Sequence, residues 1–206
     1  MHLTVLAASG ATGRELVRQG IERGHTVTAI VRNPDTAHLR ASPALTVVTG
    51  DVLDTASIER AVDPSTVVLS GLGLRKGDRG GTLLAGATSV IAAGPRRVIW
   101  LGAFGTGPSA RAAGRLTTGL LRVVLRGEIP DKVAADAAVL AAGGTVFHAG
   151  PLSDKPLSPE RRSVLVDDAP KRLFPASVGR ATVAAAMIDE AENPRHPGAV
   201  VAPLAH

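Results

Sequence analysis

Short apolar runs rich in β-branched residues alternate with longer amphipathic segments through the first half of the chain. A short apolar run bounded by turn residues predicts a buried strand, and apolar residues at helical spacing predict a helix that covers the sheet. The predicted strands cover residues 3–7, 26–31, 45–48, 66–69 and 98–101. The predicted helices between them cover residues 11–23, 54–62 and 82–93, with Gly24 as a C-cap and Asp54 or Thr55 as an N-cap. This alternation predicts right-handed βαβ crossovers and a mainly parallel α/β sheet with helices on both faces.

The second half of the chain has a less regular pattern. Predicted helices cover residues 109–126, 130–142 and 177–192, the last with Ser177 as its N-cap. Predicted strands cover residues 145–148, 161–166 and 171–174, and Val200-Val201 ends the sheet. Because no repeat, long linker or clear boundary interrupts the sequence, we predict one domain over residues 1–206. Its cofactor half spans about 1–105, and its smaller substrate-side region spans about 106–206.

Composition narrows the function classes. The 45% hydrophobic and 20% charged residues are an ordinary balance for a soluble globular protein. No apolar stretch reaches the roughly 18 residues of a membrane span, and a strand-like run follows Met1, so we expect no membrane partner and a cytoplasmic location. The chain has no cysteine, which excludes disulfides and thiolate chemistry.

The net charge of +5 comes from 23 Lys+Arg and 18 Asp+Glu and suits nucleic acid or a polyanionic cofactor. The basic residues are dispersed and aromatic residues make up 2%, so we do not expect nucleic-acid binding. The histidines show no metal-ligand spacing, and no metal site is predicted.

A glycine-containing turn, residues 7–13, lies between the first predicted strand and the first helix. Gly10 and Gly13 let the backbone approach a pyrophosphate, and the helix that follows offers unpaired amides at its N-terminus. The predicted cofactor contacts in this region are Ser9, Gly10, Ala11, Thr12, Gly13 and Arg14. The alternative is a plain tight turn between a strand and a helix.

The end of the second strand indicates which dinucleotide is bound. Arg32 lies 19 residues after Gly13, where an acidic residue would bind the ribose 2′-hydroxyl of NAD. An arginine favours a 2′-phosphate instead, and Arg40 is placed to help. We therefore expect NADPH to be preferred over NADH, the alternative being that Arg32 is a surface residue closing a strand.

The turn resembles the G-x-x-G-x-x-G loop of atypical short-chain dehydrogenases, with Ala7 in place of the first glycine. Alanine fits there if its φ is negative, so we expect weakened rather than lost binding. The chain is most similar to NAD(P)H-binding proteins of the flavin reductase and biliverdin-IXβ reductase type, within the NmrA-like group. The likeness is carried by residues 7–13, 31–32, 50–53, 70–73, 101–104 and 150–152.

The resemblance implies a Rossmann-type, doubly wound fold and assigns further cofactor contacts. Asp51 and Val52 would hold the adenine, although Asp51 as a turn residue is the alternative. Ser70, Gly71, Leu72 and Gly73 would run beside the nicotinamide-side ribose. The walls near the reacting end would be Gly102, Ala103, Phe104, Gly150, Pro151 and Leu152.

Two departures from the family pattern concern catalysis. Gly102 stands where family members often carry serine, and the Tyr-x-x-x-Lys pair of classical relatives is missing because the chain has no tyrosine. Lys132 is accordingly predicted to be a solvated helix residue. His148 is the candidate proton donor, the alternative being a hydrogen-bonded histidine under the sheet edge. Ser109 shows no nucleophile–base pattern, so a hydrolase is not expected.

Two functions remain open on the sequence. The first is an NADPH-dependent reductase that transfers hydride to a small-molecule acceptor such as a flavin, quinone or tetrapyrrole. The second is a non-catalytic NmrA-like redox sensor that binds the dinucleotide and signals to a protein partner. The charged loop 75–81 either closes over the ligand or is a mobile solvated loop, and the protein is expected to be a monomer or small homo-oligomer.

Overall fold

The computed structural model describes residues 1–75, 77–110, 127–170 and 175–205. An eight-stranded sheet in the order β3-β2-β1-β4-β5-β6-β10-β8 forms its centre. The strands are β1 (His2–Leu6), β2 (Thr26–Val31), β3 (Leu45–Thr49), β4 (Val67–Ser70), β5 (Arg97–Ala103), β6 (Thr145–Ala149), β8 (Arg161–Leu165) and β10 (Val200–Ala205). All neighbouring strands pair in parallel except β10 with β8, which are antiparallel. The fold is therefore the Rossmann-type α/β fold that the sequence predicts.

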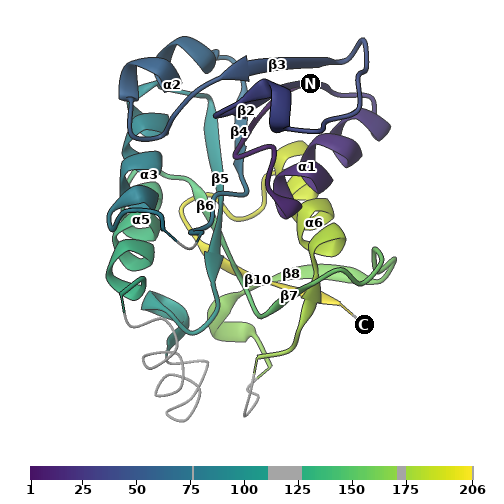
Figure 1. Ribbon diagram of the computed structural model, residues 1–206. Helices are drawn as coiled ribbons and strands as arrows, with labels where there is room; N and C mark the ends of the chain where they lie inside the picture. Colours follow the sequence, from purple (N-terminus) through teal and green to yellow (C-terminus); the bar gives the residue numbers. More distant parts are fainter. Residues whose placement is uncertain (76, 111–126, 171–174, 206) are drawn as a thin grey trace.

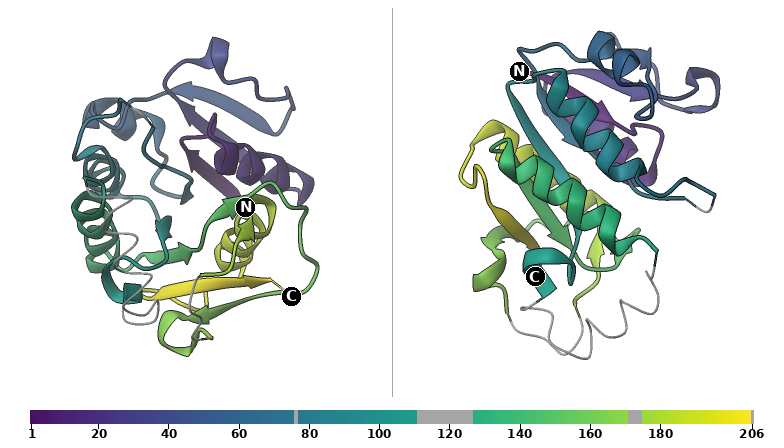
Figure 2. Two further views of the ribbon diagram at one scale, coloured as in Figure 1. Left: turned by 60° about the horizontal axis from the view of Figure 1, so that its bottom comes forward. Right: turned by 90° about the vertical axis from the view of Figure 1, so that its left-hand side faces the viewer.

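Helices cover both faces of this sheet (Figure 1 and Figure 2). On one face, α1 (Ala11–Glu22) packs beside α6 (Arg180–Glu192). The other face carries α2 (Thr55–Ala61), α3 (Thr82–Ala92) and α5 (Ile129–Ala141). Successive strand residues point to opposite faces, so the sheet separates two hydrophobic cores. Val5 belongs to the α1–α6 core, whereas its neighbour Leu6 belongs to the core beneath α3.

The predicted elements of the first half agree with the structure to within two residues. Asp54 is the N-cap of α2, accepting a hydrogen bond from Ser57 N, and Gly24 adopts a left-handed conformation after α1. In the second half, the predicted strand over 171–174 and residues 111–126 of a predicted helix lie outside the described residues. Gly107–Ser109, which include the start of that predicted helix, form a short 3-10 turn.

The start of α6 corrects one prediction. Ser177 is not the N-cap, because Val178–Gly179 form β9, which pairs with β7 (Leu152–Ser153) in a small separate sheet. Gly179 is the N-cap, and a Cβ there would lie 2.7 Å from Lys155 O. The helix can begin only after this pairing ends. Next to the edge strand β8, β10 is longer than the predicted Val200-Val201 because it pairs with β8.

Among the described residues, no helix is both long and apolar enough to cross a membrane.

Candidate active site

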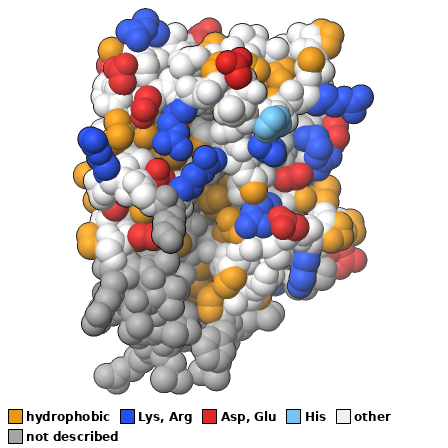
Figure 3. Space-filling model, in the orientation of Figure 1, with side chains coloured by type: hydrophobic (Ala, Val, Ile, Leu, Met, Phe, Trp, Pro, Cys, Tyr) orange, Lys and Arg blue, Asp and Glu red, His pale blue; other side chains and the backbone are white. Residues whose placement is uncertain are grey.

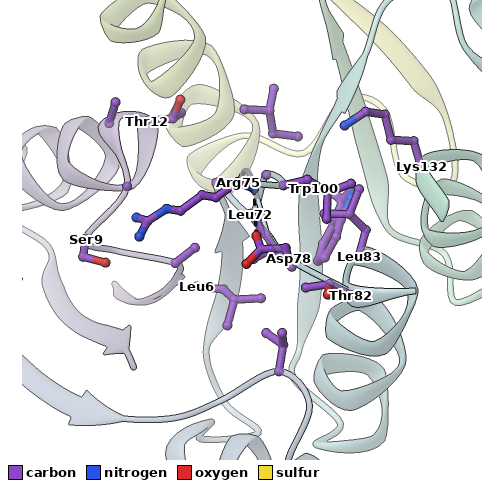
Figure 4. A pocket seen from close by; sticks show the side chains of 18 of the residues that line it. Leu6, Ser9, Thr12, Leu72, Arg75, Asp78, Thr82, Leu83, Trp100 and Lys132 are labelled. Atoms are coloured by element: carbon purple, nitrogen blue, oxygen red, sulfur yellow. Dashed lines mark hydrogen bonds between the residues drawn. The ribbon is translucent and has the colours of Figure 1, made fainter. Parts of the chain in front are cut away.

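A cavity of about 900 Å³ lies at the carboxyl ends of the central parallel strands. Its walls come from the turn after β1, the ends of β2, β5 and β6, the segment after β4, and the starts of α3 and α6. Figure 4 shows Ser9 and Thr12 on one side of this space and Trp100 and Lys132 on the other. Ligands of open α/β sheets bind at this edge, where the strand order reverses between β1 and β4.

The turn between β1 and α1 is tight and depends on Gly13. Gly10 N donates a hydrogen bond of 2.9 Å to Ala7 O. A Cβ on Gly13 would lie 2.2 Å from that same Ala7 oxygen, so only glycine fits there. The N-cap Gly10 has no side chain to bond the amides of the first turn of α1, which leaves them for an anion.

The backbone of Ala7 differs from what the sequence led us to expect. Alanine would replace glycine here without strain if its φ were negative, but its φ is 56°, in the left-handed region. The turn needs this conformation because Ala7 O must point back toward Gly10 and Gly13. The replacement of glycine is therefore tolerated at a cost in backbone strain.

Most of the predicted cofactor contacts come together in the cavity wall. Those that line it are Ser9, Gly10, Ala11, Thr12, Arg32, Asp51, Val52, Gly71, Leu72, Gly73, Gly102, Ala103, Gly150 and Leu152. The structure thus brings segments from both halves of the chain to one site.

Six predicted site residues do not line the cavity. Gly13 lies behind the turn, where Gly71 packs on it, and Ser70 is buried, its Oγ accepting a hydrogen bond from Leu72 N. Arg14 and Pro151 are exposed outside the lining. Phe104 and His148 border a second cavity of about 90 Å³ instead. These six residues lie behind or beside the cavity wall, and a ligand contact for them stays a prediction.

Arg32 stands at the mouth of the cavity with its side chain 59% exposed. Its Nη1 lies 3.8 Å from Oδ1 of Asp78, and Asp78 Oδ2 accepts a hydrogen bond of 2.7 Å from Arg75 N. Arg75, Gly77, Asp78 and Arg79 all line the cavity. The charged loop therefore lies against the site, and Figure 3 shows basic side chains around a hollow in this face.

Asp51 lines the cavity and also stabilises its own turn. Its Oδ1 accepts a hydrogen bond of 2.9 Å from Leu53 N, while its backbone amide donates to Ser57 Oγ. The structure accordingly supports the turn role that the sequence left open and keeps the carboxylate at the cavity edge.

The structure corrects the prediction for Lys132. Its side chain is 15% exposed and lines the cavity, with Nζ 3.3 Å from Glu128 Oε2. Asp136, one helical turn further along α5, lines the same cavity. The face of α5 that carries both residues meets the site because the helix packs between α3 and the strands β5 and β6.

His148 is a link in a buried hydrogen-bonded chain and not an exposed proton donor. It is 1% exposed; its Nδ1 lies 2.6 Å from Ser109 Oγ and its Nε2 lies 2.9 Å from Asp136 Oδ2. This environment matches the alternative that the sequence left open, a hydrogen-bonded histidine under the sheet edge, and Gly102 of β5 lies against the ring, since a Cβ there would lie 2.8 Å from His148 Cδ2. A Ser–His–Asp chain does exist, yet Ser109 is fully buried and cannot act as a nucleophile.

Sequence reasoning missed several wall residues. Four residues that the sequence did not predict at the site line the cavity: Trp100, Lys132, Asp136 and Arg180. The spacing of four residues between Lys132 and Asp136 puts both on one helix face, and this was the signal available. Arg180 is held by Asp154 at 2.6 Å at the start of α6.

Known proteins share both the sequence pattern and the fold. The sequence model of a family described as NAD(P)H-binding matches residues 7–194. No curated protein sequence matches the chain.

Three solved structures illustrate the shared fold. The anaerobilin reductase ChuY from Escherichia coli O157:H7 has a TM-score of 0.78 at 17% identity, with 99% of this chain and 97% of that one covered. The oxidoreductase ylbE from Lactococcus lactis has a TM-score of 0.80 at 16% identity, with 100% and 91% covered. A short-chain dehydrogenase/reductase from Veillonella parvula in complex with NADP has a TM-score of 0.76 at 16% identity, with 98% and 93% covered.

Proposed function

Because the chain belongs to the NAD(P)H-binding family, we propose that it is an NADPH-dependent oxidoreductase that reduces a flavin, quinone or tetrapyrrole-type acceptor. The observation that carries this proposal is the shape of the cavity. It runs from Arg32 at the end of β2, across the turn after β1, to Gly102 and Ala103 at the end of β5. The part at the turn after β1 suits the phosphates of a dinucleotide. The end at β5 offers a surface against which an acceptor can bind.

The residues present fit a nicotinamide dinucleotide. The amides at the start of α1 have no side-chain cap, and glycine at position 13 leaves the turn free of side-chain atoms. Ser9 and Thr12 offer hydroxyl groups beside these amides. When bound, the reduced nicotinamide supplies a hydride to the acceptor.

The protein's share of the chemistry is orientation and exclusion of water. Leu72, Trp100 and Leu152 are apolar parts of the wall, which strengthen polar contacts by keeping water away. Holding two reactants in line lowers the barrier by removing the entropy cost of their encounter. The ChuY fold likeness supports a tetrapyrrole-type acceptor among the candidates.

The reductase proposal is tested with a panel of flavin, quinone and linear tetrapyrrole acceptors. We expect oxidation of NADPH above the rate without protein, measured as loss of its absorbance. Binding without any turnover, with similar affinity for NADPH and NADP⁺ and a co-purifying protein, would instead support the redox sensor. That alternative is favoured by one observation, the burial of His148 away from the cavity.

We further propose that Arg32 selects NADPH over NADH. Arg32→Ala should weaken NADPH binding by about 1–3 kcal/mol, because a charge-assisted contact to the 2′-phosphate is lost, and leave NADH binding nearly unchanged. Titration calorimetry with both dinucleotides measures the difference. Arg60→Ala is the matched control, since Arg60 is exposed on α2 and does not line the cavity. Equal losses for the two dinucleotides in Arg32→Ala would contradict this assignment.

A further inference from the structure

The ion pair between Arg32 and Asp78 joins two walls of the cavity. Arg32 follows β2, whereas Asp78 belongs to the loop between β4 and α3, and both residues line the cavity. Nη1 of Arg32 lies 3.8 Å from Asp78 Oδ1. The guanidinium that we assign to the 2′-phosphate of NADPH therefore already faces an anion of the protein itself.

Asp78 is held in place independently of Arg32. Its Oδ2 accepts a hydrogen bond of 2.7 Å from Arg75 N, drawn as a dashed line in Figure 4, and its own amide donates one of 3.0 Å to Arg75 O. The Asp78 side chain is 18% exposed, whereas that of Arg32 is 59% exposed. The carboxylate is thus fixed in its turn, and the longer, more exposed arginine side chain is the one that can turn to another anion.

The contact between the two charges is weak enough to be exchanged. Its length of 3.8 Å exceeds the roughly 2.7–2.9 Å of a charge-assisted hydrogen bond. Exposed ion pairs contribute little free energy, and a phosphate group offers several acceptor oxygens and close to two negative charges at neutral pH. A 2′-phosphate can therefore displace Asp78 from Arg32, but it has to compete with the carboxylate to do so.

We propose that Asp78 is a specificity-determining residue that limits the preference for NADPH, because it competes with the 2′-phosphate for Arg32. The proposal rests on the proposed binding of this phosphate by Arg32. NADH carries a hydroxyl group in place of the phosphate and leaves the pair of Arg32 and Asp78 intact. Asp78 therefore weakens the binding of NADPH and hardly affects that of NADH, so the site distinguishes the two dinucleotides less than Arg32 alone would.

Charge repulsion acts in the same direction as this competition. A phosphate bound to Arg32 lies near the Asp78 carboxylate, because both anions are next to one guanidinium, and like charges at such distances repel each other. Arg75 and Arg79 line the cavity from the same loop, so the loop still presents positive charge to the rest of the ligand. The unfavourable effect of Asp78 is accordingly greatest at the group that Arg32 binds.

Asp78→Asn tests this role, because the asparagine oxygen can still accept a hydrogen bond from Arg75 N while the negative charge is removed. The dissociation constant for NADPH should fall about threefold to tenfold, since competition and repulsion both disappear. The dissociation constant for NADH should stay nearly the same. Trp100 is the only tryptophan and lines the cavity, so quenching of its fluorescence measures the binding of both dinucleotides.

A double-mutant cycle shows whether Asp78 acts through Arg32. In Arg32→Ala, the guanidinium for which the two anions compete is absent. Adding Asp78→Asn to this variant should therefore tighten NADPH binding clearly less than the same substitution does in the wild-type protein. A residue that only maintains the conformation of the loop would change the affinity by the same factor in both backgrounds.

Asp63→Asn is the matched control. Asp63 also stabilises its own turn, with Oδ1 accepting a hydrogen bond of 2.8 Å from Ser65 N, but it is exposed and does not line the cavity. The substitution removes the same unit of negative charge from the protein and should change neither dissociation constant. The comparison separates the local effect of Asp78 from that of overall charge.

Weaker binding of both dinucleotides in Asp78→Asn would overturn the proposal and show that Asp78 serves to hold the loop in place. Unchanged NADPH affinity, or an equal gain for NADPH and NADH, would overturn it as well, since neither result depends on the 2′-phosphate. In these cases a selective loss of NADPH affinity in Arg32→Ala would leave the proposed role of Arg32 standing. Without that selective loss, the role of Arg32 and the competition by Asp78 are both wrong.

Discussion

Ala7 holds a conformation that alanine rarely adopts, with φ at 56° in the turn between β1 and α1. The contact of its Cβ with the backbone costs about 1 kcal/mol, and glycine avoids this cost. Ala7→Gly is therefore expected to raise the free energy of unfolding by about 1 kcal/mol in urea denaturation. NADPH binding should become tighter or stay the same, because the turn presents the same amides.

Ala8→Gly is the control for this prediction. Ala8 is fully buried and does not have a positive φ, so the same substitution removes packing and adds backbone freedom without relieving strain. It should lower the free energy of unfolding by about 1 kcal/mol. Destabilisation of equal size in both variants would show that Ala7 carries no strain.

Site residues whose position depends only on the nearest strand or helix end could be predicted from the sequence. Gly10 and Thr12 follow a strand and open a helix, and Arg32 ends a strand, so chain order alone brings them to the cavity. Lys132 and Asp136 could not be placed, because the face of α5 that meets the site depends on packing against α3, some fifty residues earlier in the chain. His148 was expected at the correct strand end, but its burial depends on Gly102 of the neighbouring strand.

At the scale of elements, the N-terminus of α3 is capped by another helix. Its own N-cap, Gly81, has no side chain, and Asp131 of α5 accepts hydrogen bonds from Leu83 N at 3.0 Å and Leu84 N at 2.9 Å. A carboxylate there satisfies unpaired amides and complements the helix dipole. Asp131→Ala should lower the free energy of unfolding by about 2 kcal/mol, measured by urea denaturation.

Asp54→Ala provides the comparison for this cap. Asp54 is exposed and caps α2 through one longer contact, 3.3 Å to Ser57 N, so its loss should cost about 1 kcal/mol or less. If Asp131→Ala lowers the free energy of unfolding by no more than Asp54→Ala does, Asp131 does not stabilise the packing of α5 against α3. Local caps such as Asp54 are visible in the sequence, whereas a cap supplied 48 residues away is not.

At the scale of the whole molecule, basic side chains outnumber acidic ones around the cavity. Among the described lining residues, the basic ones are Arg32, Arg75, Arg79, Lys132 and Arg180, and the acidic ones are Asp51, Asp78 and Asp136. They come from loops and helices in both halves of the chain, so the excess arises only on folding. Five basic against three acidic side chains give the lining a net charge of +2, which is part of the overall +5 and favours the entry of an anionic ligand.

This arrangement predicts how salt affects binding of the two dinucleotides. NADPH carries the additional 2′-phosphate, so its affinity should fall more steeply with rising potassium chloride than that of NADH, because ions screen exposed charges over about 10 Å at 0.1 M. Titration calorimetry over a series of salt concentrations measures both slopes. In Arg32→Ala the two slopes should become nearly equal, since the exposed arginine at the cavity mouth no longer distinguishes the ligands. Equal slopes in the wild-type protein would mean that the 2′-phosphate lies away from these basic side chains, and the excess charge would then serve the pyrophosphate or the acceptor instead.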